Sequence, residues 1–148
     1  MSVRSDSRRV AVLYEPGRSG SAALDVARRL AGGDGSALTV VTLAPQDRRT
    51  YCGAGSARDY NLAVCEAAGA ELREAFELLG QVGDDAMFEL LVQDESPPPA
   101  DWVTSGGFDV VLLPARRRPL RQAGHPLADQ LRRSTRAEVR VVMPTRSR

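Results

Sequence analysis

The sequence predicts a doubly wound α/β fold, in which helices cover both faces of a five-stranded parallel sheet. Two observations predict it. Five short runs of β-branched and aliphatic residues alternate with segments of helical periodicity, and the 148 residues match the size of one domain. Strands that alternate with helices form parallel sheets, and right-handed crossovers place helices on both sides. We expect one domain over residues 1–148, with loose ends at 1–7 and 145–148.

The first two strands flank a predicted helix. Residues 9–15 are apolar and β-branched between polar ends, which is typical of a buried strand. The turn at 16–21 contains serines that are suited to cap the helix that follows. Glycines at 32–35 end this helix, and residues 37–43 form the second strand before Pro45. The apolar face of the helix consists of Ala23, Leu24, Ala27, Leu30 and Ala31.

A long helix and the third strand follow. Residues 45–56 are polar and contain glycine, so we expect a loop long enough to be mobile or functional. Residues 57–79 repeat apolar side chains every three or four positions, and Gly80 ends that helix. The glutamates of the helix are expected on its other faces. Residues 86–92 form the third strand.

The last third of the chain repeats the alternation. A short helix at 101–105 follows three prolines, and it contains Trp102, which we expect to be a packing residue. The fourth strand is predicted at 108–114, and an arginine-rich loop separates it from a helix at 127–134. Residues 138–143 complete the sheet as its fifth strand.

The composition excludes several kinds of chemistry. All 20 basic residues are arginine, so a lysine Schiff base and a lysine-dependent phosphate loop are both absent. One histidine and two cysteines fall short of the four nitrogen and sulfur ligands of a zinc site. Cys52 and Cys65 are not spaced as a redox pair. We therefore predict no metal site and no catalytic residues.

The net charge of +1 hides an uneven distribution. Residues 1–55 hold 8 arginines and 5 acids, residues 56–110 hold 2 and 12, and residues 111–148 hold 10 and 2. The basic end could meet phosphates, or it could face the acidic middle segment or an acidic partner. Because no aromatic side chains alternate with the arginines, we do not expect a nucleic-acid partner.

No segment of the sequence is apolar over the roughly 20 residues that a membrane span requires. The first ten residues are polar and lack the apolar core of a secretory signal. We therefore expect no membrane association and a cytoplasmic location.

Three segments together resemble the universal stress protein family. They are Phe108-Asp-Val-Val-Leu-Leu113, Leu127-Ala-Asp-Gln-Leu-Arg-Arg-Ser134 and Val139-Arg-Val-Val-Met-Pro144, and they follow a long acidic second helix. The resemblance covers nearly the whole chain and rests on element order and hydrophobic pattern. It implies the strand order 3-2-1-4-5 and a homodimer paired through the fifth strand. Many members of that family bind ATP, and many do not.

The ATP-binding members carry a signature after strand four: Gly, two residues, Gly, nine residues, Gly, then Ser or Thr. On this chain the first two positions fall on Pro114 and Arg117. Alignment back from the fifth strand puts the last two on His125 and Pro126, through a loop two residues shorter than in the family, and a shift by one residue would bring Gly124 to the third. At most one of the four is retained. Proline has no N–H to donate to a phosphate. The signature is therefore degenerate.

The predicted ligand site lies where strands one and four end, at the point where the strand order reverses. Glu15 stands where ATP-binding relatives carry an aspartate, and Gly17 stands for the glycine beside it. Four arginines follow strand four, and their guanidinium groups could replace the missing backbone donors, or they could form a solvated loop. His125 is a further candidate ligand residue, and the alternative is that it is a structural or exposed histidine. The candidate arginines are Arg116, Arg117 and Arg118, with Arg121 beside them.

Two functions from different classes remain open. The first is a regulatory protein similar to the universal stress proteins that does not bind ATP through the glycine signature, needs no cofactor, and acts through a protein partner or another ligand. The alternative is a nucleotide-binding module, for ATP or another nucleotide, in which the arginine loop replaces the glycine loop. For the homodimer, Val139, Val141 and Met143 alternate along the expected edge strand.

Overall fold

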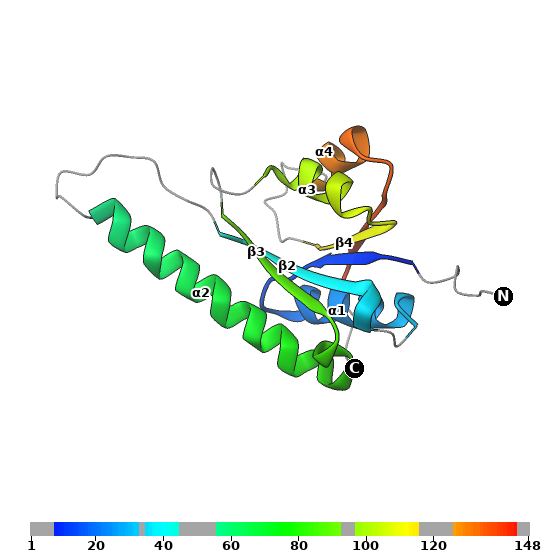
Figure 1. Ribbon diagram of the computed structural model, residues 1–148, viewed down its shortest axis with the longest axis horizontal. Coiled ribbons are helices and arrows are strands. Elements are labelled where there is room, and N and C mark those ends of the chain that lie inside the picture. The colour runs from blue at the N-terminus through cyan, green and yellow to red at the C-terminus, as the bar shows by residue number, and fades with distance from the viewer. Residues whose placement is uncertain (1–7, 33–34, 45–55, 93–96, 116–125, 145–148) are drawn as a thin grey trace.

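The computed structural model describes residues 8–32, 35–44, 56–92, 97–115 and 126–144, with the backbone alone for 56–64. All five strands are parallel and lie in the order β3-β2-β1-β4-β5, as the resemblance implied (Figure 1). The central strand β1 is therefore bounded by β2 and β4, and β3 and β5 form the edges. The strands are β1 (Val10–Leu13), β2 (Leu38–Ala44), β3 (Met87–Val92), β4 (Val110–Pro114) and β5 (Glu138–Val142).

Helices cover both faces of the sheet, which confirms the predicted doubly wound architecture. The helices α1 and α2 pack on one face, and α3 and α4 pack on the other (Figure 1). Two short 3-10 helices, η2 and η3, precede β2 and β3. The helical bounds are α1 (Arg18–Leu30), η2 (Gly35–Ala37), α2 (Ser56–Leu79), η3 (Gly80–Asp84), α3 (Pro99–Gly106) and α4 (Pro126–Ser134).

The core consists of two layers that share β1. Val10, Val12 and Tyr14 alternate toward α1 and α2, whereas Ala11 and Leu13 face α3 and α4. All five side chains are almost fully buried. A strand that is covered on both faces must be apolar along its whole length, which is the pattern that identified it in the sequence.

The start of α1 differs from the prediction. The N-cap residue is Gly17, and no side chain makes a capping hydrogen bond there, so the serines of this turn do not cap the helix. Gly17 has φ 116°, a backbone conformation that glycine adopts readily and other residues rarely adopt. Gly80, with φ 65°, follows the last residue of α2 as predicted. The predicted loop at 45–56 lies almost entirely outside the described residues.

Candidate functional site

The carboxyl ends of β1 and β4 lie side by side at the centre of the sheet. Their register pairs Val10 with Val110 and Val12 with Leu112. The chain order reverses between these two strands, since β2 and β3 lie beyond β1 and β5 lies beyond β4. In open parallel sheets a ligand crevice forms at such a point. The residues that follow β1 and end β4 are therefore the first to consider.

The loop after β1 is fixed by close backbone packing. Glu15 is half-buried, and Gly17, two residues later, is the N-cap residue of α1. Gly20, in the first turn of α1, lies so close to Glu15 that an added Cβ would stand 1.6 Å from the Glu15 carbonyl oxygen. Glu15 and Gly17 thus lie at the carboxyl end of the central strand β1, as predicted, on a loop held against the start of α1.

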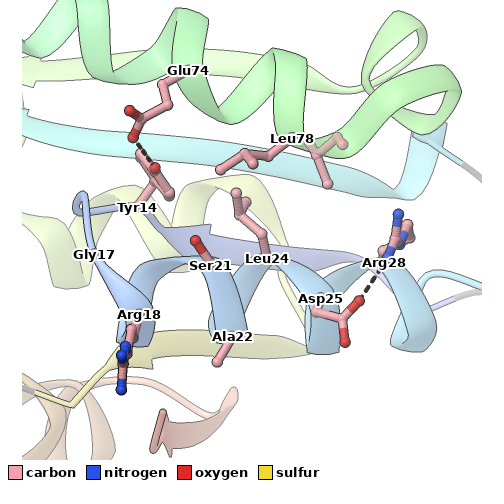
Figure 2. Close-up of a pocket in the computed structure, with 11 residues that line it drawn as sticks. Tyr14, Gly17, Arg18, Ser21, Ala22, Leu24, Asp25, Arg28, Glu74 and Leu78 are labelled. Carbon is pink, nitrogen blue, oxygen red and sulfur yellow. Dashed lines mark hydrogen bonds and ion pairs between the residues drawn. The ribbon is translucent and has the colours of Figure 1, made fainter. Parts of the chain in front are cut away.

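Tyr14 joins the end of β1 to α2. Its ring is 1% exposed, and its hydroxyl donates a hydrogen bond to the Glu74 carboxylate (Figure 2). Burial raises the pKa of Tyr14 far above its ordinary value, and the hydrogen bond to Glu74 raises it further. The hydroxyl therefore stays protonated and acts as a donor, and its hydrogen bond holds one oxygen of Glu74 in position.

Negative charge gathers around this end of β1. Glu71 is half-buried one turn before Glu74, and its pKa is raised first by burial and then by repulsion from Glu15 and Glu74. The glutamates of α2 were expected on faces other than the apolar one. Glu74 is exposed, whereas Glu71, three residues before it, is half-buried. Their spacing of three residues puts both on one side of the helix, and that side meets β1.

Replacing Glu71 with glutamine is expected to stabilise the protein at neutral pH. The folded-state pKa of Glu71 lies above its ordinary value of 4.5, so ionisation of this carboxyl opposes folding. This penalty is absent below the unfolded-state pKa and develops as pH rises through the folded-state pKa. Thermal unfolding should show a higher Tm for Glu71→Gln than for the wild type at about pH 7, and equal values at about pH 4. A gain that is unchanged at acid pH would contradict this account.

An open groove of about 820 Å³ runs between α1 and α2 (Figure 2). Tyr14 and Glu74 lie at one end of it, and Asp25 and Arg28 line it farther along α1. Arg28 is paired with Asp25 at 2.6 Å, which contributes most to the lowered pKa of Asp25. The groove adjoins Gly17 and therefore opens beside the loop after β1.

The remaining predicted ligand residues belong to the connection between β4 and α4, of which the structure describes the two ends. Pro114 is the last residue of β4 and is almost fully buried, and Pro126 is the first residue of α4. Between these prolines, residues 116–125 lie outside the described residues. The predictions for Arg116, Arg117, Arg118 and His125 fall in that segment and stay predictions.

The predicted dimer residues lie in and after β5, at an edge of the sheet. Val139 is 7% exposed and Val141 is half-buried, and both pack into the core beneath α3 and α4. Met143 follows the strand and is 69% exposed. Of the three side chains, only Met143 is largely available to a partner; the other two belong to the core of their own chain.

Within the described ranges, no group of three or more His, Cys, Asp or Glu side chains is placed to hold a metal ion. Across the same residues, no helix is both long enough and apolar enough to span a membrane.

Sequence comparison finds no matching family model and no matching curated relative. Similarity appears in the fold. A universal stress protein family member from Burkholderia pseudomallei superimposes with a TM-score of 0.65 at 19% identity, over 93% of this chain and 97% of that one. Universal stress protein UspA from Lactobacillus plantarum gives 0.66 at 14% identity, over 92% and 99%. A universal stress protein in complex with cAMP gives 0.59 at 20% identity, over 95% and 100%. The chain therefore has the fold of the universal stress proteins.

Proposed function

We propose that this chain is a cytoplasmic regulatory protein of the stress response that does not bind ATP through a glycine-rich phosphate loop. It acts through a protein partner or another ligand. The observation that carries the proposal is the pair of prolines at the two ends of the β4–α4 connection. Pro114 ends β4 and Pro126 begins α4, and neither has an N–H group to donate to a phosphate.

The charges at the end of β1 support the same proposal. Burial raises the pKa of Glu71, and repulsion from Glu15 and Glu74 raises it further. A triphosphate placed beside them would be repelled, because like charges at short range are unfavourable. The site favours a ligand that donates hydrogen bonds or carries positive charge.

The test is a search for bound nucleotide. We expect mass spectrometry of the denatured, purified protein to find no adenine nucleotide. Calorimetric titration with ATP, with and without Mg²⁺, should give no binding heat up to about 1 mM, a concentration that detects even weak ligands. A universal stress protein with an intact glycine signature is the positive control. Micromolar binding of ATP would contradict the proposal.

A second candidate is a nucleotide-binding module that uses arginines. It is favoured by the structural similarity to a universal stress protein in complex with cAMP and by the position of Glu15 and Gly17 at the end of β1. In this case AMP or cAMP should bind, and a variant with Arg116, Arg117 and Arg118 replaced by alanine should lose that binding. Binding that is indifferent to the three substitutions would exclude the arginine loop as the phosphate site.

The proposal includes a homodimer that pairs through β5. This strand is an edge of the sheet, and an identical strand could complete its backbone hydrogen bonds. Light scattering should give twice the chain mass of 15.9 kDa. Met143→Glu should shift the equilibrium toward the monomer, since Met143 is exposed at the end of this edge. A change at Val141 would be a poor test, because this residue packs in its own core. A wild-type protein that is monomeric at high concentration would contradict the dimer.

A further inference from the structure

The groove between α1 and α2 brings together side chains from both helices and from the end of the central strand. Tyr14 directly follows β1, Leu24 belongs to α1, and Glu74 and Leu78 belong to α2 (Figure 2). Its volume of about 820 Å³ falls within the range of small-molecule pockets, which is roughly 300–1,000 Å³. The groove is large enough to hold a ligand of modest size.

The charged side chains that line the groove, two arginines and two acids, balance overall, and the negative charge is concentrated at the Tyr14–Glu74 end. Arg28, farther along the groove, shares the Asp25 carboxylate with Arg29. The side chain of Arg18 points away from α2 (Figure 2). Glu74 is exposed and, among the described residues, its carboxylate accepts a hydrogen bond from the buried Tyr14 hydroxyl alone. Its remaining acceptor sites can therefore take a donor of a ligand. The charge of Glu71, one turn away, adds to that of Glu74.

The groove also has an apolar wall. Leu24 is 3% exposed and forms part of the core, whereas Leu78 is 49% exposed and lies on the opposite wall (Figure 2). A half-exposed leucine is common on protein surfaces and alone indicates nothing. Here it stands one turn from the Glu74 carboxylate, so an acceptor and an apolar surface lie within one small space.

We propose that this groove binds a small organic cation, a primary amine with an apolar body. The ammonium group donates to the Glu74 carboxylate, whose position is fixed by Tyr14, and the body lies between Leu24 and Leu78. The proposal goes beyond the function stated above. Its site is the α1–α2 groove, and the nucleotide titrations do not decide it.

The chemistry of the groove selects this class of ligand over two others. An anion at the Tyr14 end of the groove would be repelled by Glu74 and Glu71. Of the two arginines that line the groove, Arg18 points away from α2 and Arg28 is paired with Asp25 (Figure 2). A divalent metal ion needs several ligands, and the described residues hold no group of three that could supply them. A single carboxylate beside an apolar wall matches one ammonium group and one hydrophobic body.

The test uses three probes that share a phenyl body: 2-phenylethylamine, 2-phenylethanol and 3-phenylpropionate. Amide chemical shifts of the full chain are followed by NMR at neutral pH. We expect the amine to bind at least about tenfold more tightly than the alcohol, because only the amine makes a charge-assisted hydrogen bond, and the carboxylate not to bind. The shifts should centre on Tyr14, Leu24 and Glu74. Equal affinities for all three probes, tighter binding of the carboxylate, or no binding of the amine would overturn the proposal.

Matched variants separate the carboxylate from a general charge effect. Glu74→Gln keeps an acceptor for the Tyr14 hydroxyl and should weaken the amine about fivefold or more, while the alcohol is unaffected. Asp101→Asn removes the same charge from α3, on the opposite face of the sheet, and should leave the affinity for the amine and for the alcohol unchanged. Leu78→Ser should weaken the amine and the alcohol alike. Equal effects of Glu74→Gln and Asp101→Asn would overturn the assignment to this groove.

A further variant separates the charge of Glu74 from its contact with Tyr14. Tyr14→Phe removes the hydroxyl but keeps the Glu74 carboxylate and its charge. It should retain amine binding within about threefold, since the charge remains and only its positioning is weakened. Complete loss of amine binding in Tyr14→Phe, with the fold intact by NMR, would show that Glu74 is not the group that holds the ammonium.

Discussion

Replacing Gly20 with alanine is expected to lower the free energy of unfolding by about 3 kcal/mol. An alanine Cβ at this position would stand 1.6 Å from the carbonyl oxygen of Glu15 and 2.8 Å from its carbonyl carbon. Both are backbone atoms, so no side-chain rotation relieves the overlap. Either α1 or the loop after β1 must shift, and each is packed against the buried β1. Urea unfolding followed by circular dichroism measures the loss.

Gly69 provides the matched control. It lies inside α2, and an added Cβ would meet no atom within 4 Å. Gly69→Ala should therefore stabilise the protein by about 0.5–1 kcal/mol, because alanine loses less conformational entropy in a helix than glycine does. The same substitution is thus expected to act with opposite sign at two helical positions. If Gly20→Ala were as stable as the wild type, α1 would not approach Glu15 as described.

The fold could be predicted from the sequence because its signals are local. The strand β1 is apolar along its whole length since both of its faces are covered, and α2 shows its buried side at every third or fourth residue. The observed bounds of these elements differ from the predicted ones by a few residues at most. The strand order needed more than local signals, and the resemblance to the universal stress proteins supplied it.

The site was predicted only in part, because its contacts join distant residues. Glu15, Gly17 and Pro114 lie at the carboxyl ends of β1 and β4, where the strand order placed them. The contact between Tyr14 and Glu74 was missed, since it links residues 60 positions apart across two elements. In the sequence Tyr14 is simply the end of an apolar strand, and nothing in α2 distinguishes Glu74 from its other glutamates.

The start of α1 shows a different limit of sequence analysis. The serines of the turn have the composition of a helix cap, but the helix already begins at Arg18, after Gly17. A glycine with φ 116° redirects the chain before either serine can act as the N-cap. Helix existence was predicted correctly, whereas cap chemistry depended on one backbone angle that composition does not specify.

Trp102→Ala is expected to lower the free energy of unfolding by about 4 kcal/mol, in the range measured for large aromatic side chains removed from cores. Trp102 is 9% exposed, and its ring lies 4.8 Å from that of Phe108. Its indole Nε1 also donates to Glu89 of β3 at 3.1 Å, so the side chain ties α3 to an edge strand. The sequence predicted a packing residue, and this is confirmed. Chemical unfolding followed by far-ultraviolet circular dichroism measures the loss without depending on the substituted tryptophan.

Trp102→Phe separates packing from the hydrogen bond. Phenylalanine keeps a ring against Phe108 but cannot donate to Glu89, which is half-buried in β3. The loss should therefore be smaller, about 1–2 kcal/mol, of which part is the cost of the unpaired carboxylate. Combining Trp102→Phe with Glu89→Gln should recover some of this loss, because a neutral amide is less costly to leave unpaired than a carboxylate. If Trp102→Phe were as damaging as Trp102→Ala, the hydrogen bond rather than ring packing would hold α3 against the sheet.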